Sequence, residues 1–160
     1  MITTSQLEVS KTLVAAANKA HTNREVNLVL NAVCSIVEYG LYNVKATDQR
    51  LFDAILTIRA FASDRVTYDR LRVATMKAHA VACELSANGQ TPVTLVANAL
   101  WRVPLMLGPD RESECGYRVN GDIVQTIVEL VYRACPKKNR PTWCRDLENV
   151  AKATLADFPA

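Results

Sequence analysis

Residues 22–42 read TNREVNLVLNAVCSIVEYGLY, and polar side chains recur in this segment every three or four positions. This is the period of an α-helix, and the remaining positions are almost all apolar, so only a narrow stripe of the helix would face water. The stripe consists of Arg24, Asn27, Asn31, Ser35 and Glu38. Thr22 and Glu25 have the spacing of a capping box, which predicts where the helix begins. We therefore expect a helix that packs against several neighbours.

Comparable patterns run outward from this segment in both directions. They predict helices near residues 6–20, 22–42, 48–62, 67–88, 91–103, 122–135 and 141–157. Short connections and the lack of a linker predict a single domain over residues 1–160. We expect an all-α fold, a compact bundle of about seven helices, with a helical-repeat arrangement as the alternative.

The helix expected over residues 67–88 has two apolar stripes. One stripe consists of Leu71, Ala74, Ala78, Val81, Ala82 and Leu85, and the other of Val73, Met76, Ala80 and Cys83. A helix that is apolar on two sides is typical of the interior of a protein. We therefore expect this helix to be central.

Composition limits the class of protein. Hydrophobic residues make up 49% of the 160 positions, which argues against disorder, and aromatic residues only 6%, which favours closely packed helices. The net charge of +3 is well short of that of a dedicated nucleic-acid binder. The N-terminal residues do not resemble a signal peptide, and no apolar run reaches the ~18 residues that span a bilayer. We expect a cytoplasmic protein with no membrane partner.

Catalytic and metal-binding motifs are not evident. There is no Gly-rich phosphate loop, and no nucleophile stands beside His79 at a spacing that suggests activation. We therefore expect a protein that is not an enzyme and that holds no cofactor or metal. The five cysteines lack CxxC spacing and are expected to be reduced structural thiols. Metal ligation by Cys115, Cys135 and Cys144 is the alternative.

The longest irregular segment, residues 108–120, is the candidate partner-binding loop, because loops on a rigid scaffold commonly carry function. Its candidate contact residues are Asp110, Arg111, Glu112, Glu114, Tyr117 and Arg118. Trp101, on the preceding helix, is expected to extend the same surface. The competing site is the polar stripe through Arg72 and His79. We favour the loop, because a central helix is poorly placed to meet a large partner.

Four short motifs follow one another between residues 48 and 84. They are Arg59-Ala60-Phe61-Ala62, Val66-Thr67, Arg72 with Ala74, and Ala78-His79-Ala80 with Ala82. In this order they resemble the Ala-rich helical segment of the Imm-5-like immunity proteins of bacterial polymorphic toxin systems. Phe61 stands where that family tends to have Trp, and Asp64 where it has a turn Gly. The resemblance covers about a quarter of the chain and implies an all-helical protein that binds and neutralises a toxin.

Two functions remain open. The first is a small protein-binding module of the immunity, antitoxin or phage-encoded inhibitor type, acting on a partner protein. The alternative is a small regulatory nucleic-acid-binding protein that uses the basic clusters at residues 65–72 and 137–145. The second cluster adjoins Trp143, and cations beside an aromatic ring can bind phosphate and stack bases.

Overall fold

The structure, a computed structural model, describes residues 8–159. Its seven α-helices are α1 (Glu8–Lys19), α2 (Asn23–Asn43), α3 (Gln49–Ala62), α4 (Tyr68–Ser86), α5 (Pro92–Trp101), α6 (Gly121–Ala134) and α7 (Arg140–Thr154). Two short 3₁₀ helices, η2 (Val103–Met106) and η3 (Lys137–Asn139), and two strands, β1 (Leu107–Pro109) and β2 (Tyr117–Val119), complete the described elements. The all-α prediction is confirmed. The expected start of the first helix, near residue 6, lies outside the described residues.

Helix α2 is the centre of the bundle. It packs against α1, α3, α5, α6 and α7, as its narrow polar stripe predicts. α1 also packs against α6 and α7, so the first and last helices of the chain are neighbours. Repeats of a solenoid contact only their sequence neighbours, and these long-range contacts therefore make a closed bundle and not a helical repeat.

Local interactions explain where α2 begins and how closely it packs in the bundle. Thr22 and Glu25 form the predicted capping box, in which each side chain accepts a hydrogen bond from the other residue's backbone N–H. Gly40 lies in the middle of a close helix contact. A Cβ at this position would be 3.1 Å from Cγ1 of Val131 on α6 and 3.3 Å from the methyl groups of Val96 on α5. The glycine therefore lets three helices approach one another.

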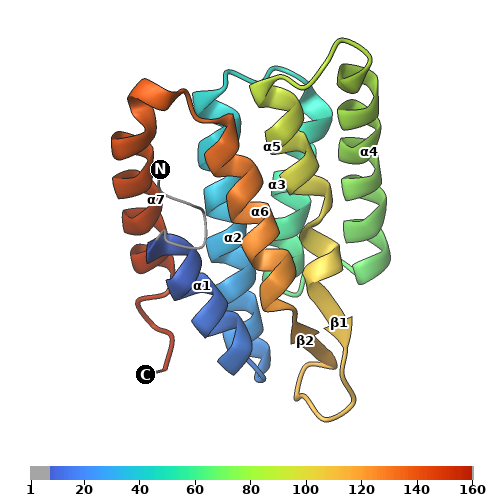
Figure 1. Cartoon of the computed structure of the whole chain (residues 1–160). Coiled ribbons are helices and arrows are strands. Elements are labelled where there is room, and N and C mark those ends of the chain that lie inside the picture. The colour runs from blue at the N-terminus through green and yellow to red at the C-terminus, as the bar shows by residue number, and fades with distance from the viewer. Residues whose placement is uncertain (1–7, 160) are drawn as a thin grey trace.

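Helix α4 is at the edge of the bundle, and the prediction that it is central is wrong. It packs against α3 and α5 and touches η2, and Figure 1 shows it as the outermost helix on one side. Its Leu71 stripe is largely buried, whereas Val73 and Met76 of the second stripe are 51% and 61% exposed. Helical periodicity shows that a stripe is apolar, but it does not show whether the same chain covers that stripe.

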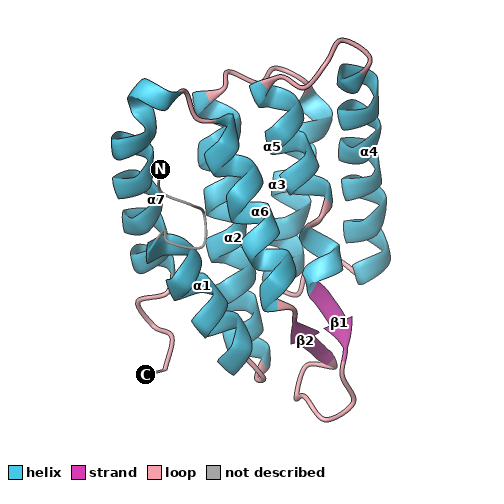
Figure 2. Ribbon diagram, viewed as in Figure 1, coloured by secondary structure: helices cyan, strands magenta, loops and turns pink. Residues whose placement is uncertain are grey.

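The expected irregular segment contains a β-hairpin. β1 and β2 are antiparallel, with Leu107 opposite Val119 and Pro109 opposite Tyr117. Asn120 ends the hairpin: its N–H donates to the Met106 carbonyl at 2.7 Å, and its side chain caps the start of α6. The hairpin follows α5 and η2 in the chain and precedes α6, and it extends from the lower end of the bundle in Figure 2.

Candidate functional site

The side of α4 that faces α5 has a Trp–His contact. The rings of Trp101 and His79 meet edge to face, with centroids 4.6 Å apart and planes at 69°. Trp101 is fixed by its own neighbours: its Nε1 donates to Oδ1 of Asn98 at 2.9 Å, and the Arg102 guanidinium lies 4.3 Å from the ring centroid. The sequence predicts Trp101 beside the loop and His79 in the competing site, but the structure brings these two residues together.

Cys83 also lies beside His79. Its Sγ is 3.7 Å from Nε2 of His79, because residues four apart are neighbours on a helix. The sequence prediction, that no nucleophile stands beside His79 at a spacing that suggests activation, overlooks this thiol four residues further along the helix. Among the described residues, this is the one hydrogen bond of the His79 ring, so no third group orients the imidazole as in a catalytic triad. Both side chains are exposed on the helix surface.

The outward face of α4 carries the second apolar stripe of the sequence. We call Val73, Met76, Ala80 and Cys83 the outer stripe, and all four are exposed. Basic side chains flank it. His79 is on the α5 side, and Arg72, seven residues before it, lies on the same side of the helix; Arg70 and Lys77 are on the α3 side, where they line a groove.

This groove, the α3–α4 groove, has a volume of about 490 Å³. Its apolar lining comes from Leu56, Ala60, Val66, Val73 and Ala74, and its polar lining from Arg50, Asp53, Thr57, Asp69, Arg70 and Lys77. Leu56 is 65% exposed. Val73 belongs both to the groove and to the outer stripe, so the two features form one continuous face.

An ion-pair bridge fixes the two helices that form the groove. Arg50 on α3 contacts Asp48 at 2.8 Å and Glu84 on α4 at 2.7 Å. The hydrogen bonds from Arg50 lower the pKa values of the Asp48 and Glu84 carboxyls. The bridge ties the start of α3 to the end of α4 and leaves the charge of Glu84 satisfied within the chain.

Tyr117, the aromatic residue of the hairpin, packs against other aromatic residues of the chain. Tyr117 stacks on Tyr68 at the start of α4, with ring centroids 5.7 Å apart, and meets Phe61 of α3 edge to face at 6.2 Å. Burial raises the pKa of Tyr117. The Tyr68 hydroxyl in turn donates to the Pro104 carbonyl at 3.3 Å. Tyr117 therefore attaches the hairpin to α3 and α4, and it is only partly available to a partner.

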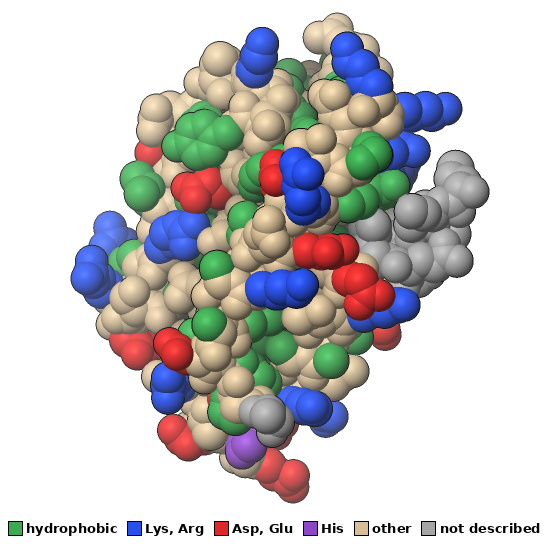
Figure 3. Space-filling model, turned by 90° about the vertical axis from the view of Figure 1, so that its left-hand side faces the viewer, with side chains coloured by type: hydrophobic (Ala, Val, Ile, Leu, Met, Phe, Trp, Pro, Cys, Tyr) green, Lys and Arg blue, Asp and Glu red, His purple; other side chains and the backbone are tan. Residues whose placement is uncertain are grey.

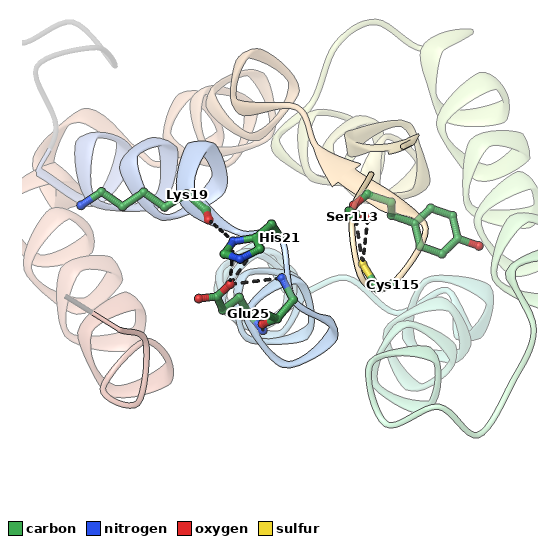
Figure 4. A network of polar contacts seen from close by, with 7 residues as sticks. Lys19, His21, Glu25, Ser113 and Cys115 are labelled. Atoms are coloured by element: carbon green, nitrogen blue, oxygen red, sulfur yellow. Dashed lines mark hydrogen bonds and ion pairs between the residues drawn. The ribbon is translucent and has the colours of Figure 1, made fainter. Parts of the chain in front are cut away.

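The hairpin tip also rests on the turn between α1 and α2. The N–H of Glu114 donates to the His21 carbonyl at 3.2 Å, and Figure 4 shows this turn beside Cys115. The His21 ring is exposed, with Nδ1 3.3 Å from Oε1 of Glu25, so His21 has the turn position expected of it. The charged tip residues Arg111, Glu112 and Glu114 and Arg118 of β2 are exposed, and Asp110 is half-buried. They form a surface apart from Trp101, because Trp101 meets α4 at His79 whereas the hairpin meets α4 at Tyr68, eleven residues earlier and ~16 Å away along the helix.

The two basic clusters lie at opposite ends of the molecule. Residues 65–72 surround the start of α4 at the lower end in Figure 1, whereas residues 137–145 lie at the upper end. Trp143 is only 4% exposed and packs edge to face on Tyr39 at 5.3 Å, so it cannot stack on a base. Figure 3 views the α7 side of the molecule, where acidic and basic side chains are interspersed.

The cysteines are free thiols in the structure. Over residues 8–159, no three His, Cys, Asp or Glu side chains are grouped so that they could hold a metal ion. Cys115 is on the hairpin, while Cys135 and Cys144 are near the opposite end of the bundle, so the alternative three-cysteine site does not form. Burial raises the pKa of Cys34 to about 12 and that of Cys135 to about 11.

Comparison with known proteins yields no assignment. No model of a protein family matches the chain, and no curated protein or solved structure gives a significant match. Within the described part of the chain, no helix combines the length and apolarity needed to cross a membrane.

The outer stripe and Cys83 are site features that the sequence predictions do not include. The signal is present in the spacing of Val73, Met76, Ala80 and Cys83, but the same spacing also fits a second core face. Leu56 carried no separate signal, because one apolar residue on the polar side of a helix is common.

Proposed function

We propose that this protein is a protein-binding module that receives its partner on the outer stripe and the α3–α4 groove. One observation carries the proposal: Leu56, Val73 and Met76 are 65%, 51% and 61% exposed on two adjacent helices. Single exposed apolar residues are ordinary, but a contiguous apolar face with a charged border is typical of an interaction site. Binding would remove this face from water, and each Å² of apolar surface buried would stabilise the complex by roughly 25 cal/mol.

The edge position of α4 favours this face over the hairpin. The preference for the loop rests on the expectation that a central helix is poorly placed to meet a large partner, and α4 is not central. Arg72 and His79 border the outer stripe, and Trp101 extends it toward α5. The hairpin keeps its exposed charges, but its aromatic residue, Tyr117, is engaged by Tyr68.

The resemblance to Imm-5-like immunity proteins supports a role in neutralising a partner protein in the cytoplasm. The residues that carry it, from Arg59 to Ala82, belong to α3, α4 and the turn between them. Those two helices also form the apolar face. An immunity-type or inhibitor-type protein acts by binding, which needs no catalytic group.

Site-specific photo-crosslinking in the source cells tests this function. A photoreactive amino acid replaces Met76 in one variant and Ala153, an exposed residue of α7, in a matched control. We expect one defined protein to be crosslinked from position 76 and not from position 153. A third variant carries the photoreactive amino acid at position 111 of the hairpin. Crosslinking of the partner from position 111 and not from position 76 would show that the loop is the binding site.

The nucleic-acid alternative has weaker support. It rests on exposed Arg65, Arg70 and Arg72 at one end of α4. Retention of the protein on duplex DNA that falls steeply with salt would favour this alternative, because phosphate contacts release counterions.

A further inference from the structure

The spacing of the outer stripe specifies the shape of its occupant. Val73, Met76, Ala80 and Cys83 follow one another at intervals of three, four and three residues, which is the a/d spacing of a helix that packs along a second helix. The stripe spans eleven residues, and its ends are ~15 Å apart, which is about three helical turns. A narrow, straight seam of this kind fits a helix better than a strand or a flat surface.

The charges beside the stripe specify the chemistry of the occupant. Arg70, Arg72 and Lys77 are exposed and form no ion pair within the described residues. Glu84 also lies near the stripe, but Arg50 already neutralises it at 2.7 Å. Two acidic residues are exceptions: Asp69 at the start of the helix and Asp53 on the α3 wall of the groove. The border is therefore predominantly positive, and acidic side chains would complement it.

We propose that the outer stripe binds an amphipathic α-helix of a partner protein, about three turns long, whose apolar seam is flanked by Asp and Glu. This inference rests on the proposed function and adds the chemistry of the partner. A second copy of the chain fits less well. In an isologous dimer Lys77 and Arg72 would approach the same positive border of the partner copy.

A peptide selection provides the test. The probes are helical peptides with Leu at a and d positions and with Glu, Lys or Ser randomised at the flanking positions. They are selected on the immobilised full-length protein. We expect enrichment of Glu at the flanking positions and a preference for Lys on the Arg70→Glu, Arg72→Glu, Lys77→Glu triple variant.

Two matched variants separate seam binding from adsorption. Ala80→Glu inserts a charge into the centre of the stripe, and Ala153→Glu makes the same change at an exposed position of α7. Both positions face solvent, so both variants should fold. We expect Ala80→Glu to weaken the selected peptides at least tenfold and Ala153→Glu to leave them unchanged.

The outcomes distinguish this inference from the proposed function. Enrichment without a Glu preference, or equal binding to Ala80→Glu, overturns the acidic-helix proposal, even if crosslinking at position 76 still captures a partner. Failure of that crosslinking overturns the proposed function itself. A dimer in sedimentation experiments that Ala80→Glu dissociates would identify a second copy as the occupant and would also overturn the inference.

Discussion

Trp101 at the end of α5 contacts His79 in the middle of α4, with the two ring centroids 4.6 Å apart. Through this contact, the indole borders the outward face of the edge helix and not the hairpin. Trp101 is half-exposed, whereas the other tryptophan of the chain, Trp143, is buried between α2 and α7. The two indoles therefore report on different parts of the molecule.

Binding at the outer stripe should change the fluorescence of Trp101. Its emission depends on the exposure of the indole and on its contact with His79, and both would change when a helix covers the adjacent face. We expect a shift in emission on adding a selected peptide, and loss of the shift in Trp101→Phe. Trp143→Phe should keep it. A shift that persists without Trp101 would mean that binding alters the core.

Cys83 should be the first thiol to react with an alkylating reagent. Cys83 is exposed, whereas Cys34 is fully buried. Burial raises the pKa of Cys34 to about 12, so the reactive thiolate form of Cys34 is scarce. Mass spectrometry after brief alkylation should locate the first adduct at Cys83 and none at Cys34. Cys83→Ser should remove this rapid phase. Bound peptide should slow it, because Cys83 is part of the outer stripe.

Gly40→Ala should destabilise the protein although alanine is the better helix former. The gain in helix propensity is about 0.5–1 kcal/mol. A Cβ at 3.1 Å from Val131 and 3.3 Å from Val96 overpacks the contact, at about 1–3 kcal/mol. We expect a net loss of about 1 kcal/mol in chemical denaturation, partly restored by Val131→Ala. An increase in stability would show that α5 and α6 can move apart without cost.

The sequence predicted the helices well because their signals are local. The capping pair Thr22 and Glu25 and the Thr91-Pro92 start are each contained within a few residues, and both are helix starts in the structure. The location of a helix within the bundle is not local. From the sequence, either apolar stripe of α4 could be the buried one, or both could be. Only the packing of α3 and α5 against α4 shows which stripe is covered.

The candidate site was less predictable for the same reason. Arg72, His79 and Trp101 were all chosen from the sequence, but Trp101 was grouped with the loop by proximity in the chain. Its place beside the basic cluster predicts Trp143 as a stacking surface, yet its indole is buried against Tyr39. Chain proximity assigned both tryptophans to the wrong neighbours, since tertiary contacts decide which face a side chain reaches.

Glu25 should give the protein a measurable loss of stability in acid. Its carboxylate accepts hydrogen bonds from the N–H groups of Thr22 at 3.1 Å and His21 at 3.3 Å. These bonds, that from Thr22 first, hold the pKa of Glu25 below its usual value of 4.5 although burial opposes them. Because the folded pKa is below the unfolded value, the stabilisation is complete above about pH 4.5 and is lost as pH falls through the folded pKa.

The comparison of wild type with Glu25→Gln isolates this carboxylate. Asp48 and Glu84 also have lowered pKa values, so both proteins should lose stability in acid, but the difference between them should depend on Glu25 alone. We expect the variant to be about 1 kcal/mol less stable at neutral pH, because the capping box loses its charged acceptor. The difference should shrink as pH falls below 4.5 in urea denaturation measured at a series of pH values. A difference that stays constant across this range would mean that the carboxylate contributes through its shape and not through its charge.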